Sequence, residues 1–68
     1  MTEEISAREK HAIGGYFDDF IYELEKKIGE AKRDAERYPQ SAVLLSTWQK
    51  HLKNILEFVK QEGKDYYL

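Results

Sequence analysis

Apolar residues recur every three or four positions along the first half of the chain. They fall at Ile13, Phe17, Phe20, Leu24, Ile28, Ala31, Ala35 and Tyr38, with Ile21 and Tyr16 on the two flanks. At about 100° per residue, the first eight project onto one stripe roughly 80° wide, while the positions between them carry many charged side chains. The pattern predicts an amphipathic helix over about residues 7–37, with one face packed and the other solvated.

The start of this helix carries a capping signal followed by a weak point. Ser6 and Glu9 have the spacing of a capping box, which predicts a helix that begins at residue 7. The apolar stripe does not continue before Ile13, so we expect the first dozen residues to pack poorly. Gly14 and Gly15 would each cost about 1 kcal/mol inside the helix, and we expect a frayed first turn or a break at this pair. We favour this weak helix start over a hinge or a site where another backbone approaches closely.

A turn and a second helix come next. Pro39 disfavours helical geometry at Tyr38, and Ser41 can cap a helix that starts after it, so residues 38–41 are predicted to form a loop. The second helix is predicted over about residues 42–62, and Gly63 offers a stop before a tail at 63–68. Its apolar set spans an arc of about 120° and consists of Leu44, Leu45, Trp48, Leu52, Ile55, Leu56 and Val59.

These elements define the expected fold class. A short loop between two long helices favours antiparallel neighbours, so we predict an all-α chain that forms one helical-hairpin domain over residues 1–68. The hairpin is an antiparallel αα-hairpin, and two hairpins could pair into a helical bundle.

The second helix is more apolar than a hairpin needs. One seam between two helices requires only a narrow stripe, so part of the broader face lacks a partner, as do Phe58 and His51 at its edge and Val43 farther round. We expect a protein partner or a second copy to cover this surface, rather than the N-terminal segment or the tail folding back. The predicted partner-binding residues are Leu45, Trp48, Leu52, Ile55, Phe58 and Val59.

Trp48 and the tyrosines outside the apolar stripe of the first helix give weaker predictions. For Trp48 the hairpin core is the commoner fate, and an interface position is the alternative. Tyr22 projects away from the apolar stripe of its helix, and we expect it to be exposed together with Tyr66 and Tyr67 in the tail.

Size and charge narrow the functional classes. The chain has 68 residues, no cysteine and a formal net charge of -2, so neither thiol chemistry nor nucleic-acid binding is expected. A single core of this size rarely supplies more than about 3–5 kcal/mol, which again favours a homo- or hetero-oligomer. No apolar run is long enough to span a membrane and the first four residues are acidic, so we predict a cytoplasmic protein without a signal peptide.

Catalytic and metal chemistry find no support in the residue pattern. The only histidines, His11 and His51, lie on different predicted helices, and no ligand spacing repeats. Asp18, Asp19 and Glu23 point in different directions on a helix, so a solvated face is the better interpretation than an acid/base cluster. We expect His51 to be a surface or edge residue rather than a pH switch. The prediction is a non-enzymatic protein with no catalytic residue, no cofactor and no metal.

Several short stretches resemble a known group of proteins. Residues 15–20, the loop Tyr38-Pro39-Gln40-Ser41, the pair Leu44-Leu45 and the segment from Trp48 to Leu52 are similar to the small helical-hairpin proteins of bacterial type III secretion. That group includes needle subunits and the YscE-like needle co-chaperones. The short chain and the apolar second helix are more similar to the co-chaperones. The resemblance implies a two-helix hairpin that docks on a larger helical-repeat chaperone and helps to keep the needle subunit unpolymerised.

The predicted function is therefore a protein–protein interaction module that presents an apolar helix face to a helical partner, in the manner of a needle co-chaperone. Two alternatives stay open. One is a self-assembling structural subunit, either a bundle dimer or a needle- or rod-like polymer. The other is a small acidic regulator that binds another protein through residues such as Asp18, Asp19, Glu23 and Glu25.

Overall fold

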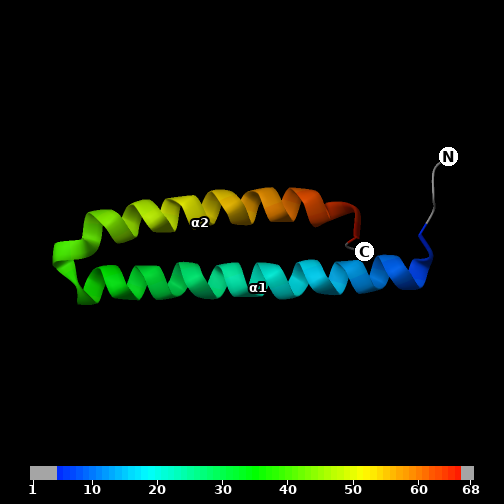
Figure 1. Cartoon of the computed structure of the whole chain (residues 1–68), viewed down its shortest axis with the longest axis horizontal. Coiled ribbons are helices and arrows are strands. Elements are labelled where there is room, and N and C mark those ends of the chain that lie inside the picture. The colour runs from blue at the N-terminus through cyan, green and yellow to red at the C-terminus, as the bar shows by residue number, and fades with distance from the viewer. Residues whose placement is uncertain (1–4, 67–68) are drawn as a thin grey trace.

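The computed structural model describes residues 5–66, which form two long antiparallel helices joined by a tight turn (Figure 1). Helix α1 (Ala7–Arg37) begins at the predicted capping box. The Ser6 backbone N–H donates to Glu9 Oε1 and the Glu9 N–H donates to Ser6 Oγ, each at 3.2 Å. These reciprocal bonds satisfy two backbone donors that would otherwise lack a partner at the helix start.

The turn is built around Pro39. Tyr38 leaves helical geometry at φ -122° and ψ 78°, as expected for a residue that precedes proline. A short 3-10 helix, η1 (Pro39–Ser41), comes next, and helix α2 (Ala42–Gly63) continues directly from it. The expectation that Ser41 caps α2 is wrong: it occupies the N-cap position, but its side chain makes no capping hydrogen bond. Because η1 runs straight into α2, the backbone hydrogen bonds of its turn satisfy N–H groups that a capping side chain would otherwise satisfy.

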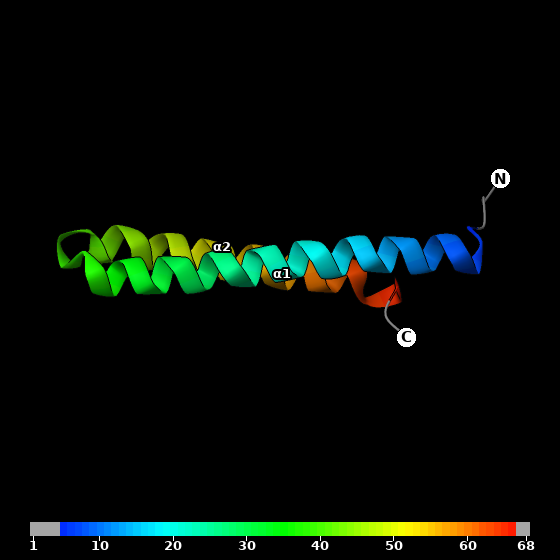
Figure 2. The ribbon, with the colours of Figure 1, turned by 90° about the horizontal axis from the view of Figure 1, so that it is seen from below.

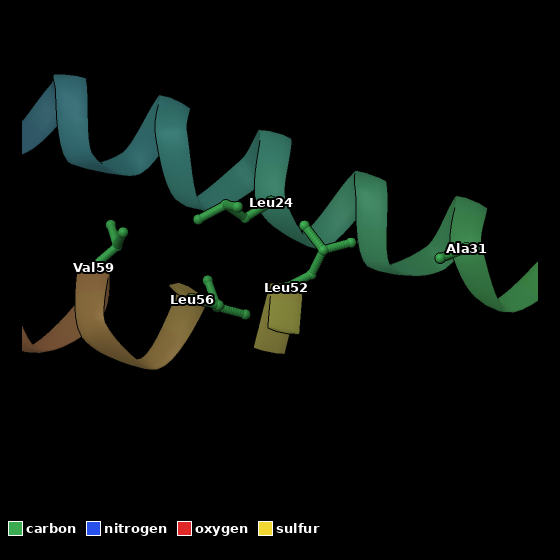
Figure 3. Close-up of a cluster of buried hydrophobic side chains, with 5 residues drawn as sticks. All are labelled: Leu24, Ala31, Leu52, Leu56 and Val59. Atoms are coloured by element: carbon green, nitrogen blue, oxygen red, sulfur yellow. The ribbon is translucent and has the colours of Figure 1, made fainter. Parts of the chain in front are cut away.

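The two helices meet along one narrow seam. Leu24 and Ala31 of α1 point towards Leu52, Leu56 and Val59 of α2, and these five side chains form the buried core (Figure 3). Phe17, Ile21 and Ile28 pack against this cluster and are partly buried. Among the described residues none of the large side chains is less than 2% exposed. The hairpin therefore has a thin core with no second layer behind it.

The chain after α2 folds back towards α1, as Figure 1 shows at the end of the rod opposite the Pro39 turn. A second 3-10 turn, η2 (Lys64–Tyr66), brings the Tyr66 ring against Phe17, with ring centroids 5.6 Å apart and planes inclined by 23°. A Cβ built on Gly14 would lie 2.9 Å from the Tyr66 carbonyl oxygen. Gly14 is therefore a site of close backbone approach.

The predicted break at Gly14-Gly15 does not occur, because α1 runs unbroken through both glycines. Docking of η2 explains this at Gly14: the turn shields that side of the helix and needs the missing Cβ to do so. The favoured interpretation as a weak helix start is therefore wrong for Gly14, and the alternative of a close backbone approach holds, with the approaching backbone supplied by the chain's own C-terminal turn. The expectations for Tyr67 and for the ends of the chain at 1–4 and 67–68 lie outside the described residues.

The result is a flat rod of 54 × 19 × 15 Å, one helix pair thick (Figure 2). Residues 5–66 contain helices and no strand, which confirms the all-α hairpin. No helix within that range is long and apolar enough to cross a membrane.

Candidate protein-interaction surface

Several large apolar side chains lie outside the seam. Phe58 is 65% exposed, and Phe20, Leu44, Trp48 and Ile55 are also exposed. Seven residues make about two helical turns, so Phe20 and Lys27 lie nearly in line along α1, as do Trp48 and Ile55 along α2. Relative to the buried positions Leu24 and Leu52, both rows are displaced to the same side of the hairpin. We call the set Phe20, Leu44, Trp48, Ile55 and Phe58 the apolar face.

A groove at one end of this face joins the two helices directly. It has a volume of about 450 Å³ and is lined by Ile13, Phe17, Phe20, Phe58, Val59, Glu62 and Tyr66. Phe20 of α1 and Phe58 of α2 therefore lie at the same level along the rod. Six of the seven lining residues are apolar or aromatic, so this end of the face could accept an apolar side chain from another molecule.

The other end of the apolar face is bordered by charge. A groove of about 180 Å³ is lined by Lys27, Glu30, Ala31 and Asp34 of α1 and by Leu45 and Trp48 of α2. The Trp48 side chain thus lies beside two carboxylates and one ammonium group of α1. An edge that combines an aromatic ring with charged groups at its border is typical of the core-and-rim arrangement of protein interfaces.

The six predicted partner-binding residues separate into two groups. Leu52 and Val59 are 2% and 6% exposed, so they stabilise the hairpin and cannot contact a partner in this conformation. The sequence pattern could not distinguish them, because a helical wheel does not show which part of a broad apolar arc meets the neighbouring helix. Trp48, Ile55 and Phe58 are exposed, and Leu45 is partly buried at the edge of the seam. These four keep the prediction of partner binding.

Trp48 has the less expected of the two environments considered for it. It is 48% exposed and lies outside the buried cluster, so the core is not its location. Phe20 is the residue that sequence reasoning missed: it belongs to the apolar stripe of α1 yet is half-exposed. Its exposure could be recognised only from the structure, because the seam is centred on Leu24 and Ala31 and Phe20 lies to one side of it.

The tail covers only part of the apolar surface. Tyr66 stacks on Phe17 of α1, and it lines the groove that also holds Phe58. Phe58 nevertheless remains largely exposed, as do Trp48 and Ile55 farther along α2. Fold-back of the tail therefore occurs, but within residues 5–66 it leaves most of the apolar face open. Tyr22, on the opposite side of α1, is 64% exposed as predicted, whereas Tyr66 is partly buried.

The charged residues singled out from the sequence do not converge. Asp18 and Glu25 are seven residues apart on one flank of α1, whereas Asp19 and Glu23 lie on the other flank. His11 and His51 are both exposed. Across residues 5–66, no group of three or more His, Asp or Glu side chains could hold a metal ion.

Comparison with known proteins adds no further constraint. No protein-family model, curated protein or solved structure matches this chain. The resemblance to type III secretion hairpins therefore stays a prediction from the sequence.

Proposed function

We propose that this chain is a non-enzymatic interaction module that acts by burying its apolar face against helices of another polypeptide. The observation that carries the proposal is the one-sided distribution of exposed large apolar residues on a two-helix rod. Phe20 comes from α1, and Trp48, Ile55 and Phe58 come from α2, so the surface exists only when the hairpin is formed. The hairpin's role is then to hold residues from two helices in one plane.

The size of the surface supports this function. Aromatic side chains bury roughly 150–250 Å² each, so Phe20, Trp48 and Phe58 at their observed exposures leave on the order of 300 Å² uncovered. Leu44 and Ile55 bring the total to about 400–500 Å², which lies in the range of the largest apolar patches on ordinary monomers. Such patches are commonly sites of interaction, and burying one is favourable by about 25 cal/mol per Å² before the costs of association.

The shape favours helices as the occupant. The rod is long and narrow, with two antiparallel helices along its length (Figure 2), and the apolar face takes its residues from both of them. A further helix can pack its side chains between such rows, with an interaxial distance of about 8–10 Å. A needle co-chaperone that docks on a helical-repeat chaperone would use a surface of this kind. That specific role is the part of the proposal that rests on sequence resemblance alone.

Site-specific photo-crosslinking in the native host tests the proposal. A photoreactive phenylalanine analogue replaces Phe58 or Trp48 in the full chain, and in matched controls it replaces Tyr22 or Val43. All four side chains are exposed, but Tyr22 and Val43 lie away from the apolar face. We expect crosslinked products from Phe58 and Trp48 and little or none from the controls.

Two outcomes would contradict the proposal. Equal crosslinking at all four positions would mean that exposure alone, and not the apolar face, determines the contacts. An absence of products at Phe58 and Trp48, with the chain folded and present at its normal level, would mean that the face meets no polypeptide. The mass of a specific product shows whether the contacted polypeptide is a different protein or a second copy.

A further inference from the structure

We infer that the apolar face is occupied by a second copy of this chain, in a four-helix bundle whose twofold axis runs parallel to the helices. This inference rests on the proposed function and names its partner. In this arrangement α1 of one copy packs against α2 of the other, and both turns lie at the same end of the bundle. Residues at a given level, meaning a given position along the long axis of the hairpin, then face residues at the same level of the second copy.

The first argument is that the apolar levels of the two helices coincide. Phe20 and Phe58 line one groove and therefore lie at one level. In the same way Ala31 and Trp48 line one groove nearer the turn. The twofold axis places Phe20 against Phe58 of the second copy, and the Lys27 side chain, which lies beside buried Ala31, near its Trp48 ring. An isologous contact of this kind requires a self-complementary surface, and the level that holds Phe20 and Phe58 provides one.

The second argument is charge. The rim of α1 beside the apolar face carries Glu23, Lys27, Glu30 and Asp34 and is acidic in sum, whereas α2 has no Asp or Glu between residues 42 and 56, and Glu62 lies at its far end. Packing α1 against α2 of the second copy therefore places this acidic rim beside a helix segment without carboxylates. The inverted dimer, with α1 against α1, would instead bring the acidic rims of the two copies together. Like charges across a helix interface are unfavourable, so the first arrangement is preferred.

The third argument is area. If each copy buries its apolar face of about 400–500 Å², the dimer buries about 800–1,000 Å² in total, which is below the size of stable interfaces and typical of weak, transient ones. The expected product is therefore a weak dimer in exchange with monomer. A larger area would be needed for an obligate complex, whereas a much smaller one would be typical of incidental contact.

The test begins with the purified full chain and no other protein. Sedimentation equilibrium over a concentration series should show a mass that rises from 8.1 kDa towards twice that value. Phe58→Glu should raise the dissociation constant about tenfold or more, because it places a charge against Phe20 of the second copy in an apolar contact. Tyr22→Glu introduces the same charge at an equally exposed aromatic residue and should leave the constant unchanged, since Phe58 is 65% and Tyr22 64% exposed. Circular dichroism verifies that both variants remain helical, and Phe20→Glu repeats the test from α1 should Phe58→Glu unfold the chain.

The arrangement within the dimer is tested by one spin label. The chain has no cysteine, so Gln40→Cys in the exposed turn gives a single attachment site per copy. With both turns at the same end and helices 8–10 Å apart, labels on the two copies should lie within about 25 Å. In the inverted dimer centred near Lys27, the 13 positions from Lys27 to Gln40, at 1.5 Å each, would separate the labels by about 40 Å.

Each result bears on the inference in a defined way. A chain that stays monomeric at millimolar concentration, an equal effect of Phe58→Glu and Tyr22→Glu, or a label separation near 40 Å would overturn it. The proposed function fails separately, because it predicts crosslinks from the apolar face in the host. A monomeric purified chain that still gives face-specific crosslinks to a different protein would retain the proposed function and remove only the second copy as its occupant.

Discussion

Three glycines of α1 offer the same substitution in different surroundings. A Cβ on Gly14 would lie 2.9 Å from the Tyr66 carbonyl oxygen, whereas a Cβ on Gly15 or Gly29 would have no described atom within 4 Å beyond its helical neighbours. None of the three has positive φ, so alanine fits the backbone at each site. Because alanine is more favourable than glycine in a helix by about 1 kcal/mol, we predict that Gly15→Ala and Gly29→Ala each stabilise the chain by that amount.

Gly14→Ala should behave differently. It gains the same helix propensity, but the new Cβ meets a backbone oxygen, which cannot move aside as the end of a flexible side chain can. The η2 turn must therefore shift, which loosens the stacking of Tyr66 on Phe17. An aromatic pair of this kind contributes about 0.5–1.5 kcal/mol, so the loss offsets the gain. We expect the free energy of unfolding of Gly14→Ala to be about 1 kcal/mol lower than that of Gly15→Ala.

Urea unfolding followed by far-UV circular dichroism measures these differences at one fixed protein concentration. For a domain of this size 1 kcal/mol corresponds to about 4–8 °C in Tm, so thermal unfolding resolves them as well. Equal stabilisation by Gly14→Ala and Gly15→Ala would refute the reasoning, because it would mean that η2 does not press against α1 at Gly14. Destabilisation by Gly15→Ala or Gly29→Ala would show that these positions are more crowded than the hairpin indicates.

The remaining predictions concern the seam and the helix ends. Leu52→Ala should lower the free energy of unfolding by about 2–4 kcal/mol, because Leu52 is 2% exposed. The same change at exposed Leu44 should lower it by less than about 0.5 kcal/mol in dilute monomer. Urea unfolding measures both, and the comparison contains no difference in helix propensity because the substitution is the same. Ser6→Ala should cost about 1 kcal/mol through loss of the capping box, visible as faster amide exchange in the first turn of α1. Ser41→Ala should leave the amide exchange of α2 nearly unchanged, because its side chain makes no capping bond.

Elements whose causes are local in sequence were predictable. The bounds of α1 follow from the Ser6 capping box at one end and from Pro39 just past the other, whereas Gly63 is the last helical residue of α2 and not the left-handed stop expected after it. The antiparallel hairpin follows from the short connection between two amphipathic helices. Each of these features depends on residues within a few positions of one another, so the linear pattern contains the necessary information.

The features that were not predictable depend on how the two helices are rotated against each other. The apolar arc of α2 includes both Trp48 and Leu52, but only Leu52 is buried in the seam, because the seam occupies less of the arc than the apolar residues cover. The approach of Tyr66 to Gly14 joins residues at opposite ends of the chain, and no local pattern encodes it. For the same reason Phe20 could not be recognised as part of an exposed face. Such assignments require the register between helices, which is a property of the tertiary structure.

The thin seam and the exposed face are thermodynamically coupled. Five buried side chains give a hairpin with little stability of its own, since cores of this size rarely supply more than about 3–5 kcal/mol. A second copy that binds only the folded hairpin adds about 2.7 kcal/mol when it is present at 100 times its dissociation constant, which is comparable to the seam itself. The Tm should therefore rise with protein concentration. Leu52→Ala weakens the seam and lowers the Tm at every concentration, whereas Phe58→Glu removes the concentration dependence and leaves the dilute chain nearly unchanged. A wild-type Tm independent of concentration would mean that the hairpin is stabilised from within, and that the apolar face contributes nothing to folding.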